Sequence, residues 1–224
     1  MAKGIFITAT GTDVGKTYVS ALILKKLIEN GEKAIYYKAA LSGAKEGKDS
    51  KLIAEDASYV FEKSGIELEP NDYVSYIYKH AYSPHLAAQI ENRPLELSKV
   101  YSDYKKLQEQ YDYIVAEGSG GLVCPLRLDD QNQIMLTDVI KKLGLDIIIV
   151  SQSGLGSINS TILTINYAKS QNIDVKGIIL NNYDKENPIH RDNKIQLEKL
   201  SGIEVLALVG ENEDNISIEI DKLK

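Results

Sequence analysis

A stretch of glycine, threonine and lysine near the start of the chain has the spacing of a phosphate-binding loop. Residues 8–17 have the sequence TATGTDVGKT, between an apolar, β-branched run and a helical pattern. In that setting the backbone N–H groups of the loop and of the helix N-terminus can surround phosphate oxygens. Lys16 would supply a mobile positive charge to the β- and γ-phosphates, and Thr17 would offer a hydroxyl to Mg²⁺. The loop therefore predicts nucleotide binding.

The loop departs from the general pattern GxxxxGK[ST] at its first position. Thr10 stands five residues before Gly15, where the pattern has glycine, and the glycine is the next residue, Gly11. A Gly/Thr turn before an amphipathic helix is the alternative interpretation. The strand before the loop and the helix after it favour nucleotide binding over this alternative.

A carboxylate follows an apolar run further along the chain. Residues 113–121 have the sequence YIVAEGSGG, so Glu117 stands at a predicted strand end before a glycine-rich turn. An acid at the carboxyl end of a strand can face bound phosphates and hold Mg²⁺, and the glycines leave room for a ligand. An ordinary turn with a solvated glutamate is the alternative.

Two further charged residues are candidates for the same site. Lys38 is predicted to end the second strand, which we expect to lie beside the first, so its ammonium could meet a phosphate or a carboxylate. Asp56 lies in the next predicted helix. A solvated lysine and a surface aspartate are the alternatives, since charged residues are mostly exposed.

The elements that would position these residues alternate between strands and helices. Short apolar runs predict strands, and apolar residues at helical spacing predict helices between them. The predicted strands are residues 4–10, 33–38, 111–116, 146–151, 175–181 and 204–208, and the predicted helices are residues 17–30, 49–64, 97–110 and 157–170, with a further helix start at Ser83–Pro84. The alternation predicts one α/β domain over residues 1–224, a parallel sheet flanked by helices. We expect the acidic tail from Glu211 to be loosely held.

The composition is that of an ordinary globular protein. Apolar residues make up 43% and charged residues 26% of the chain, and the net charge of -6 argues against a nucleic-acid or anionic-membrane partner. The single cysteine, Cys124, excludes an internal disulfide, and we interpret it as a small buried residue. No signal peptide and no membrane-spanning run is apparent, so a cytoplasmic location is expected.

Several segments, taken together and in order, resemble the dethiobiotin synthetase family. They are TGTDVGKT at 10–17, YYKAALSG at 36–43, SPHLAA at 83–88, VAEGSGGLVCPL at 115–126 and GLGSINSTILT at 154–164. The resemblance extends from about residue 4 to about residue 182 and implies a P-loop NTPase-like fold. It also implies a ligase of biotin biosynthesis, a homodimer with its substrate site at the interface.

The reaction implied by the resemblance uses 7,8-diaminopelargonate, CO₂ or bicarbonate, and MgATP. A carbamate forms on one amine, ATP phosphorylates it, and the second amine closes the ring to give dethiobiotin, ADP and phosphate. Lys16 and Lys38 would be catalytic, and Thr17, Asp56 and Glu117 would hold Mg²⁺.

The resemblance implies binding residues as well. Asn181 would contact the adenine edge, and Asn159 would reach the carboxylate end of the diamine from the partner subunit. The implied nucleotide-binding residues are Thr12, Asp13, Val14, Gly15, Lys16, Thr17, Tyr18, Glu117 and Asn181. The implied substrate-binding residues are Thr12, Ser42, Gly118, Ser119, Gly120, Gly121 and Asn159.

Some positions depart from the family pattern. Ala39 stands where a proline commonly follows the strand lysine, and residues 207–212 (ALVGEN) lack the proline that usually marks the adenine loop. The order of residues 11–13 also differs slightly from many members. Because the proline of the adenine loop is missing, the residues around the base, and the preference between ATP and other nucleotides, are left undetermined.

Three other functions compete with this one. Cobyrinate amidases of the same branch use an attached glutaminase domain, for which the 224 residues leave no room. Partition-type regulatory ATPases carry an extra lysine early in the loop (KGGxGKT), and ATGTDVGKT has none before Lys16. A pure nucleotide-binding module would leave Glu117, Lys38 and Ser42 without a task.

Overall fold

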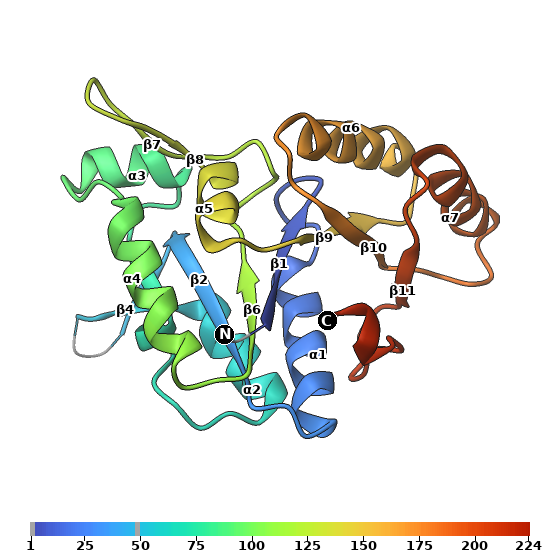
Figure 1. The fold of residues 1–224 in the computed structure, drawn as a ribbon, viewed down its shortest axis with the longest axis horizontal. Helices are drawn as coiled ribbons and strands as arrows, with labels where there is room; N and C mark the ends of the chain where they lie inside the picture. The colour runs from blue at the N-terminus through green and yellow to red at the C-terminus, as the bar shows by residue number, and fades with distance from the viewer. Residues whose placement is uncertain (1–2, 48–49) are drawn as a thin grey trace.

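The computed structural model describes residues 3–47 and 50–224, and its centre is a seven-stranded parallel sheet (Figure 1). The strand order is β11-β10-β9-β1-β6-β2-β5. The strands are β1 Lys3–Ala9, β2 Ala34–Ser42, β5 Val74–Tyr78, β6 Tyr113–Glu117, β9 Ile147–Gln152, β10 Val175–Asn181 and β11 Val205–Val209. Their side chains are almost all buried, as expected for parallel strands covered on both faces.

Helices cover both faces of this sheet, which confirms the predicted α/β architecture. The helices are α1 Lys16–Glu29, α2 Glu55–Ser64, α3 Pro84–Ile90, α4 Leu97–Gln108, α5 Leu136–Leu143, α6 Ser157–Ser170 and α7 Pro188–Ser201. The chain moves one way along the sheet from β1 through β2 to β5, and the other way from β5 through β6, β9 and β10 to β11. Right-handed crossovers therefore place α1 and α2 on one face and α4 to α7 on the other.

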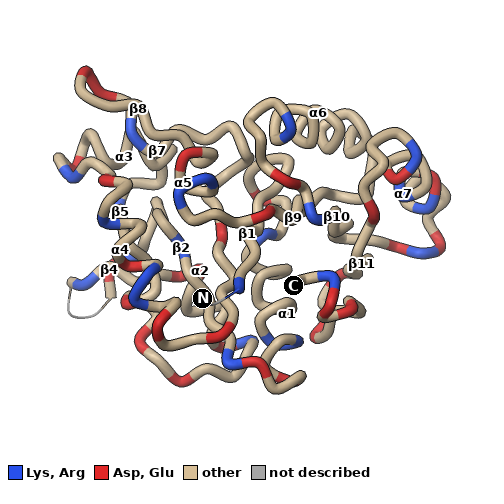
Figure 2. The backbone as a smooth tube through the Cα atoms, viewed as in Figure 1, with Lys and Arg blue, Asp and Glu red and all other residues tan. Residues whose placement is uncertain are grey.

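Small elements complete the fold. Two antiparallel pairs lie outside the main sheet, β3 Lys45–Glu46 with β4 Leu52–Ile53 and β7 Pro125–Leu128 with β8 Gln133–Met135. Short 3₁₀ helices span Pro70–Tyr73 and Ile220–Lys222. Figure 2 shows basic and acidic residues interspersed along the described chain. None of its helices is long and apolar enough to span a bilayer.

The second strand differs from its prediction in length and in neighbours. It continues past Lys38 to Ser42, because β5, which the sequence did not predict, pairs with this part of β2. It also does not lie beside β1, since β6 is inserted between the two. Lys38 is therefore inside the strand and in register with Glu117 of β6.

The predicted helix 49–64 begins later than expected, and its residue 49 lies outside the described residues. Leu52 and Ile53 form β4, and α2 begins at Glu55. Asn71 fixes this boundary: its Oδ1 accepts from Ala54 N at 2.8 Å, and its Nδ2 donates to Leu52 O at 2.7 Å. The start of α3 after Ser83 is confirmed, but the Ser83 side chain makes no capping bond.

The prediction of a loosely held tail was wrong. Ile216, Ile218 and Leu223 are buried, because the tail returns along α1 and α2. Lys25 Nζ donates to Asp214 O at 2.9 Å, and Lys63 forms an ion pair with Asp214 at 3.1 Å. The alternation of isoleucines in this segment outweighs its acidic composition.

Candidate functional site

A cavity of about 490 Å³ lies at the carboxyl ends of the central strands. Apart from Leu41, every residue that lines it was a predicted site residue. The lining consists of Thr12, Asp13, Gly15, Lys16, Thr17, Lys38, Leu41, Ser42, Asp56, Glu117, Ser119 and Gly120. The strand order thus brings together segments that are separated by about 100 positions in the sequence, as in the contact of Thr17 with Glu117.

The phosphate-loop candidate connects β1 to α1 and requires glycine at its end. Gly15 has a φ of 96°, and a Cβ there would lie 2.1 Å from Asn181 Nδ2. Such a contact is impossible for a real side chain, so residue 15 must be glycine for Asn181 to pack against the loop. Asn181 Nδ2 donates to Val14 O at 3.0 Å, and its buried Oδ1 has no partner. The amide is thus oriented with a free acceptor.

Lys16 is the first residue of α1 and is buried against the loop. Its Nζ donates to Gly11 O at 3.1 Å. Desolvation lowers the pKa of Lys16, and the neighbouring Lys38 lowers it further, against a smaller opposing effect of Glu117. A bound polyanion would remove this cost, because it offers the ammonium a counter-charge that the loop does not supply.

Lys38 lies between two carboxylates at the floor of the cavity. Its Nζ is 2.6 Å from Asp56 Oδ2 and 2.6 Å from Glu117 Oε1. Burial would lower the pKa of Lys38, but the charges of Glu117 and Asp56 outweigh it and raise the pKa above its usual value. The side chain is therefore a cation with two of its three N–H donors directed at carboxylates.

Glu117 ends β6 and is the most enclosed acid of the site. It is 1% exposed, and its Oε1 accepts from Lys38 and, at 3.0 Å, from Thr17 Oγ1. Its Oε2 is buried without a hydrogen-bond partner. Within residues 3–47 and 50–224, no group of three or more His, Cys, Asp or Glu residues is placed to hold a metal ion.

These oxygens fit a Mg²⁺ ion that is shared with a ligand. Mg²⁺ prefers hard oxygen donors and is usually bound by one or two carboxylates together with substrate phosphates and water. Glu117, Asp56 and Thr17 offer carboxylate and hydroxyl oxygens beside the phosphate loop, and the unpartnered Oε2 is an acceptor without a donor. The residues present therefore fit the ion, with phosphate oxygens completing its shell.

The glycine-rich turn after Glu117 packs against the phosphate loop. A Cβ on Gly121 would lie 3.4 Å from Gly11 Cα, and one on Gly118 would lie 2.9 Å from Leu136 Cδ2. Ser119 Oγ donates to Ala40 O at 2.6 Å, which joins the turn to β2. Larger side chains at the two glycines would separate the walls of the cavity.

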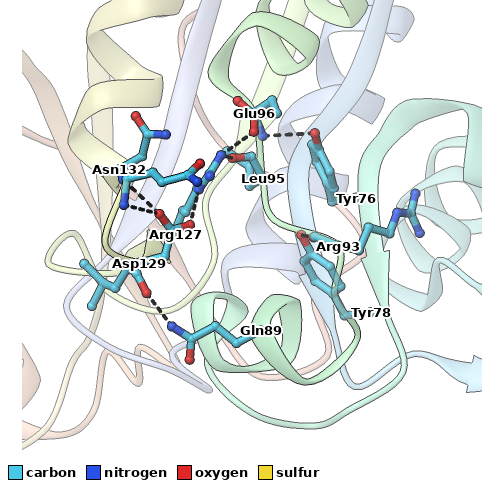
Figure 3. A network of polar contacts seen from close by, with 11 residues as sticks. Tyr76, Tyr78, Gln89, Arg93, Leu95, Glu96, Arg127, Asp129 and Asn132 are labelled. Atoms are coloured by element: carbon cyan, nitrogen blue, oxygen red, sulfur yellow. Dashed lines mark hydrogen bonds and ion pairs between the residues drawn. The ribbon is translucent and has the colours of Figure 1, made fainter.

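A network that the sequence did not indicate anchors the β7–β8 hairpin beyond this turn (Figure 3). Arg127 is buried and forms ion pairs with Glu96 and Asp129. Asp129 Oδ1 in addition accepts from the backbone N of Gln131 at 2.9 Å and of Asn132 at 2.8 Å. The network ties the hairpin to the start of α4. No short motif marks it, because Glu96 stands 31 residues before Arg127.

Cys124 lies just before the hairpin and is buried, as expected. Burial raises the pKa of its thiol to about 11, although the charges of Lys16 and Lys38 act in the opposite direction. The thiol is therefore protonated at neutral pH and a poor nucleophile.

Several predicted site residues do not line the cavity. Asn159 is exposed on the first turn of α6, and Tyr18 donates its hydroxyl to Glu213 O in the tail. Val14 is buried behind the loop, and Gly118 and Gly121 support the turn from behind.

The sequence has close relatives of known name. A family model described as an AAA domain matches residues 3–217. A protein named ATP-dependent dethiobiotin synthetase BioD from Clostridium botulinum (strain Eklund 17B / Type B) is 52% identical, over 100% of this chain and 97% of that protein. The protein of the same name from strain Alaska E43 / Type E3 is 51% identical over the same shares.

Solved structures share the fold at low sequence identity. A chain of the MinC:MinD cell division protein complex from Aquifex aeolicus superposes with a TM-score of 0.60 at 16% identity, covering 99% of this chain and 85% of that one. A ParA family ATPase from Chlorobium tepidum TLS gives a TM-score of 0.59 at 18% identity, covering 95% and 87%.

Proposed function

Because the chain belongs to the ATP-dependent dethiobiotin synthetase family, we propose that its cavity converts 7,8-diaminopelargonate, CO₂ and ATP into dethiobiotin, ADP and phosphate. The observation that supports this most strongly is the convergence of Lys16, Lys38 and Glu117 on one cavity beside the phosphate loop. The structural neighbours, below 20% identity, speak for the fold alone.

The reaction needs positive charge around a transferring phosphoryl group more than it needs a protein nucleophile. A carbamate formed on one amine of the substrate supplies the attacking oxygen. The new P–O bond forms between this oxygen and the γ-phosphorus, while the bond to the ADP oxygen breaks. The second amine then attacks the carbonyl carbon, a C–N bond forms, and phosphate departs as the ureido ring closes and a proton is lost.

The proposed roles of the two lysines follow from their different partners. Lys16 donates only to a backbone carbonyl, so its ammonium is available to the β- and γ-phosphates. Lys38 keeps one N–H donor beyond the two directed at Asp56 and Glu117, and we assign it to the carbamate and the γ-phosphate. Mg²⁺ bound by Thr17, Asp56 and Glu117 would neutralise charge on the phosphates.

The substrate and the nucleotide base are assigned to opposite ends of the loop. Thr12, Ser42 and the turn at Gly118–Gly121 would contact the carbamate end of the substrate. Asn181 Nδ2 is committed to Val14 O, so the unpartnered Oδ1 is the atom that would accept a hydrogen bond from the base. An acceptor fits the exocyclic amine of adenine, and it would equally fit that of cytosine.

The remaining assignments concern assembly and location. Asn159 is exposed and away from the cavity of its own chain, which agrees with a homodimer in which it reaches the partner's diamine carboxylate. A cytoplasmic location belongs to the same proposal, because the reaction consumes ATP.

Measuring ADP release with and without diaminopelargonate and bicarbonate tests the proposal. We expect rapid ADP release only when both are present, with dethiobiotin detected by mass spectrometry in the same samples. Reactions that lack one of the two serve as controls. Equal ATP hydrolysis without the diamine would contradict the carboxylase and favour a regulatory ATPase.

A further inference from the structure

A tyrosine hydroxyl is buried beneath the proposed metal site without a hydrogen-bond partner. Tyr36 is 0% exposed, and its Oη is among the buried polar atoms that no donor or acceptor satisfies. Leaving a buried hydroxyl unpaired is costly, so such a group calls for an explanation. Neither the phosphate loop nor the family resemblance assigns it a role.

The sheet places this hydroxyl below Glu117. Tyr36 precedes Lys38 by two residues in β2, so both side chains project from the same face of the sheet. Lys38 is in register with Glu117, and Tyr36 is in register with Val115, which precedes Glu117 by two residues in β6. A carboxylate has only acceptor oxygens, so a tyrosine hydroxyl that meets Glu117 must be the donor.

The neighbouring tyrosine shows what a structural hydroxyl looks like in this sheet. Tyr37 projects from the opposite face, where its Oη meets Ser75 Oγ at 2.8 Å and donates to Val100 O at 3.0 Å. Its hydrogen-bonding capacity is used within the fold. Tyr36 Oη has no such bond, and Oε2 of Glu117, on the neighbouring strand, has none either.

We propose that Tyr36 is a positioning residue that orients the Glu117 carboxylate for Mg²⁺ by donating its hydroxyl to Oε2. The donor without an acceptor and the acceptor without a donor then satisfy each other. A carboxylate oxygen has two lone pairs, so Oε2 can accept from below and still face a cation above. This inference rests on the proposed metal site. Groups that hydrogen-bond to a metal ligand hold that ligand in the orientation that the metal requires.

Tyr104 provides a matched control. It is also a fully buried tyrosine with an unpartnered hydroxyl, but it lies on α4, on the other face of the sheet. Burial alone raises the pKa of Tyr104, and no carboxylate contributes. Tyr104→Phe therefore removes a comparable hydroxyl that faces no metal ligand.

The test is calorimetric ADP binding, with Mg²⁺ and with EDTA, for the unaltered chain, Tyr36→Phe and Tyr104→Phe. In EDTA we expect all three to bind ADP equally. With Mg²⁺ we expect Tyr36→Phe to bind about tenfold more weakly than the other two, since removal of a ligand's partner typically costs 10–100-fold in metal affinity. The Mg²⁺ concentration for half-maximal turnover should rise by a similar factor, with the KM for diamine unchanged.

Each other outcome has a definite meaning. If Tyr36→Phe matches the unaltered chain under both conditions, the hydroxyl does not position Glu117 and the inference is wrong. If it weakens ADP binding equally in EDTA, its role is structural and the inference is wrong as well. If Mg²⁺ does not change ADP binding by the unaltered chain, the proposed metal site itself fails.

Discussion

Lys38 in the cavity and Arg127 in the β7–β8 hairpin are each held between two carboxylates, but the surroundings of the two cations differ. The side chains of the Arg127 partners are 53% and 31% exposed, and Asp129 has further backbone donors. The Glu117 side chain that pairs with Lys38 is fully buried and has an unpartnered oxygen. The planar fork of an arginine suits a closed network, whereas a lysine ammonium keeps a spare donor.

The comparison suggests how to distinguish a structural ion network from a ligand site. The Arg127 network is complete within the fold, because the guanidinium and the Asp129 carboxylate both have partners from the protein itself. The cavity keeps a free carboxylate oxygen on Glu117, and Asn181, packed against the phosphate loop, keeps a free amide acceptor. Glu117 Oε2 and Asn181 Oδ1 are thus unsatisfied where a ligand is proposed to bind, in agreement with the general expectation that such atoms in native proteins have a reason.

The largest effect is expected for Lys16→Ala, which extends the comparison to a cation without a carboxylate partner. Dethiobiotin formation should fall by about 1,000-fold, because one preorganised charge at the transferring phosphate is removed. The midpoint of thermal unfolding of the ligand-free protein should hardly change. The substitution removes one hydrogen bond, but it also removes a desolvated charge that Lys38 repels. Retained turnover, or a large loss of stability, would contradict the assignment.

Lys38→Ala should reduce product formation by about 100-fold, or ~3 kcal/mol in the activation free energy. The ligand-free protein should also lose about 3 kcal/mol of stability, because Glu117 is left buried without its counter-charge. ADP affinity should stay close to normal, since its contacts lie mainly on the loop.

Two measurements separate these effects of Lys38. Adding Glu117→Gln to Lys38→Ala should restore much of the stability without restoring turnover, as followed by urea unfolding and mass spectrometry. Loss of ADP binding by Lys38→Ala, with normal turnover of the residual complex, would instead show that Lys38 has a structural role like that of Arg127.

Glu117→Gln should raise the Mg²⁺ concentration for half-maximal turnover by about tenfold, because an amide is a poorer ligand for a hard cation than a carboxylate. A Mg²⁺ titration of the initial rate measures this shift. Asp129→Asn, in the other network, is the matched control and should leave the titration unchanged. An identical titration for Glu117→Gln would remove Glu117 from the ligands of the ion.

The smallest effect on turnover is expected for Arg127→Met, which keeps the length and apolar stem of the side chain. The free energy of unfolding should fall by about 1–2 kcal/mol, since the abandoned carboxylates are partly exposed and can be hydrated. Turnover should remain within about twofold at a temperature where the protein is folded. A large loss of turnover at unchanged stability would show that the hairpin network belongs to the site.

Local sequence patterns predicted the elements of the site better than their arrangement. The phosphate loop, α1 and Glu117 each lie within one contiguous pattern, and they were predicted close to where they occur. The insertion of β6 between β1 and β2, and with it the register of Lys38 and Glu117, depends on contacts between distant segments. Periodicity carries no information about such pairing.

The missed elements have similar causes. The strand β5 is apolar, but as an edge strand it is recognised only through its pairing with β2. The alternating isoleucines of the tail were masked by acidic neighbours, so burial was not predicted. The opposite environments of Tyr36 and Tyr37 follow from strand alternation, but which face carries the cavity was not apparent from the residues alone.

The position of β1 in the middle of the sheet has a consequence for how the protein acquires its structure. Both neighbours of β1, residues 113–117 and 147–152, are supplied by the second half of the chain. Non-local pairing of this kind folds slowly, because a long segment must be ordered before its contacts form. During synthesis the phosphate loop therefore precedes its acid by about 100 residues. We therefore expect ATP to stabilise the folding protein only after β6 has paired with β1 and completed the site.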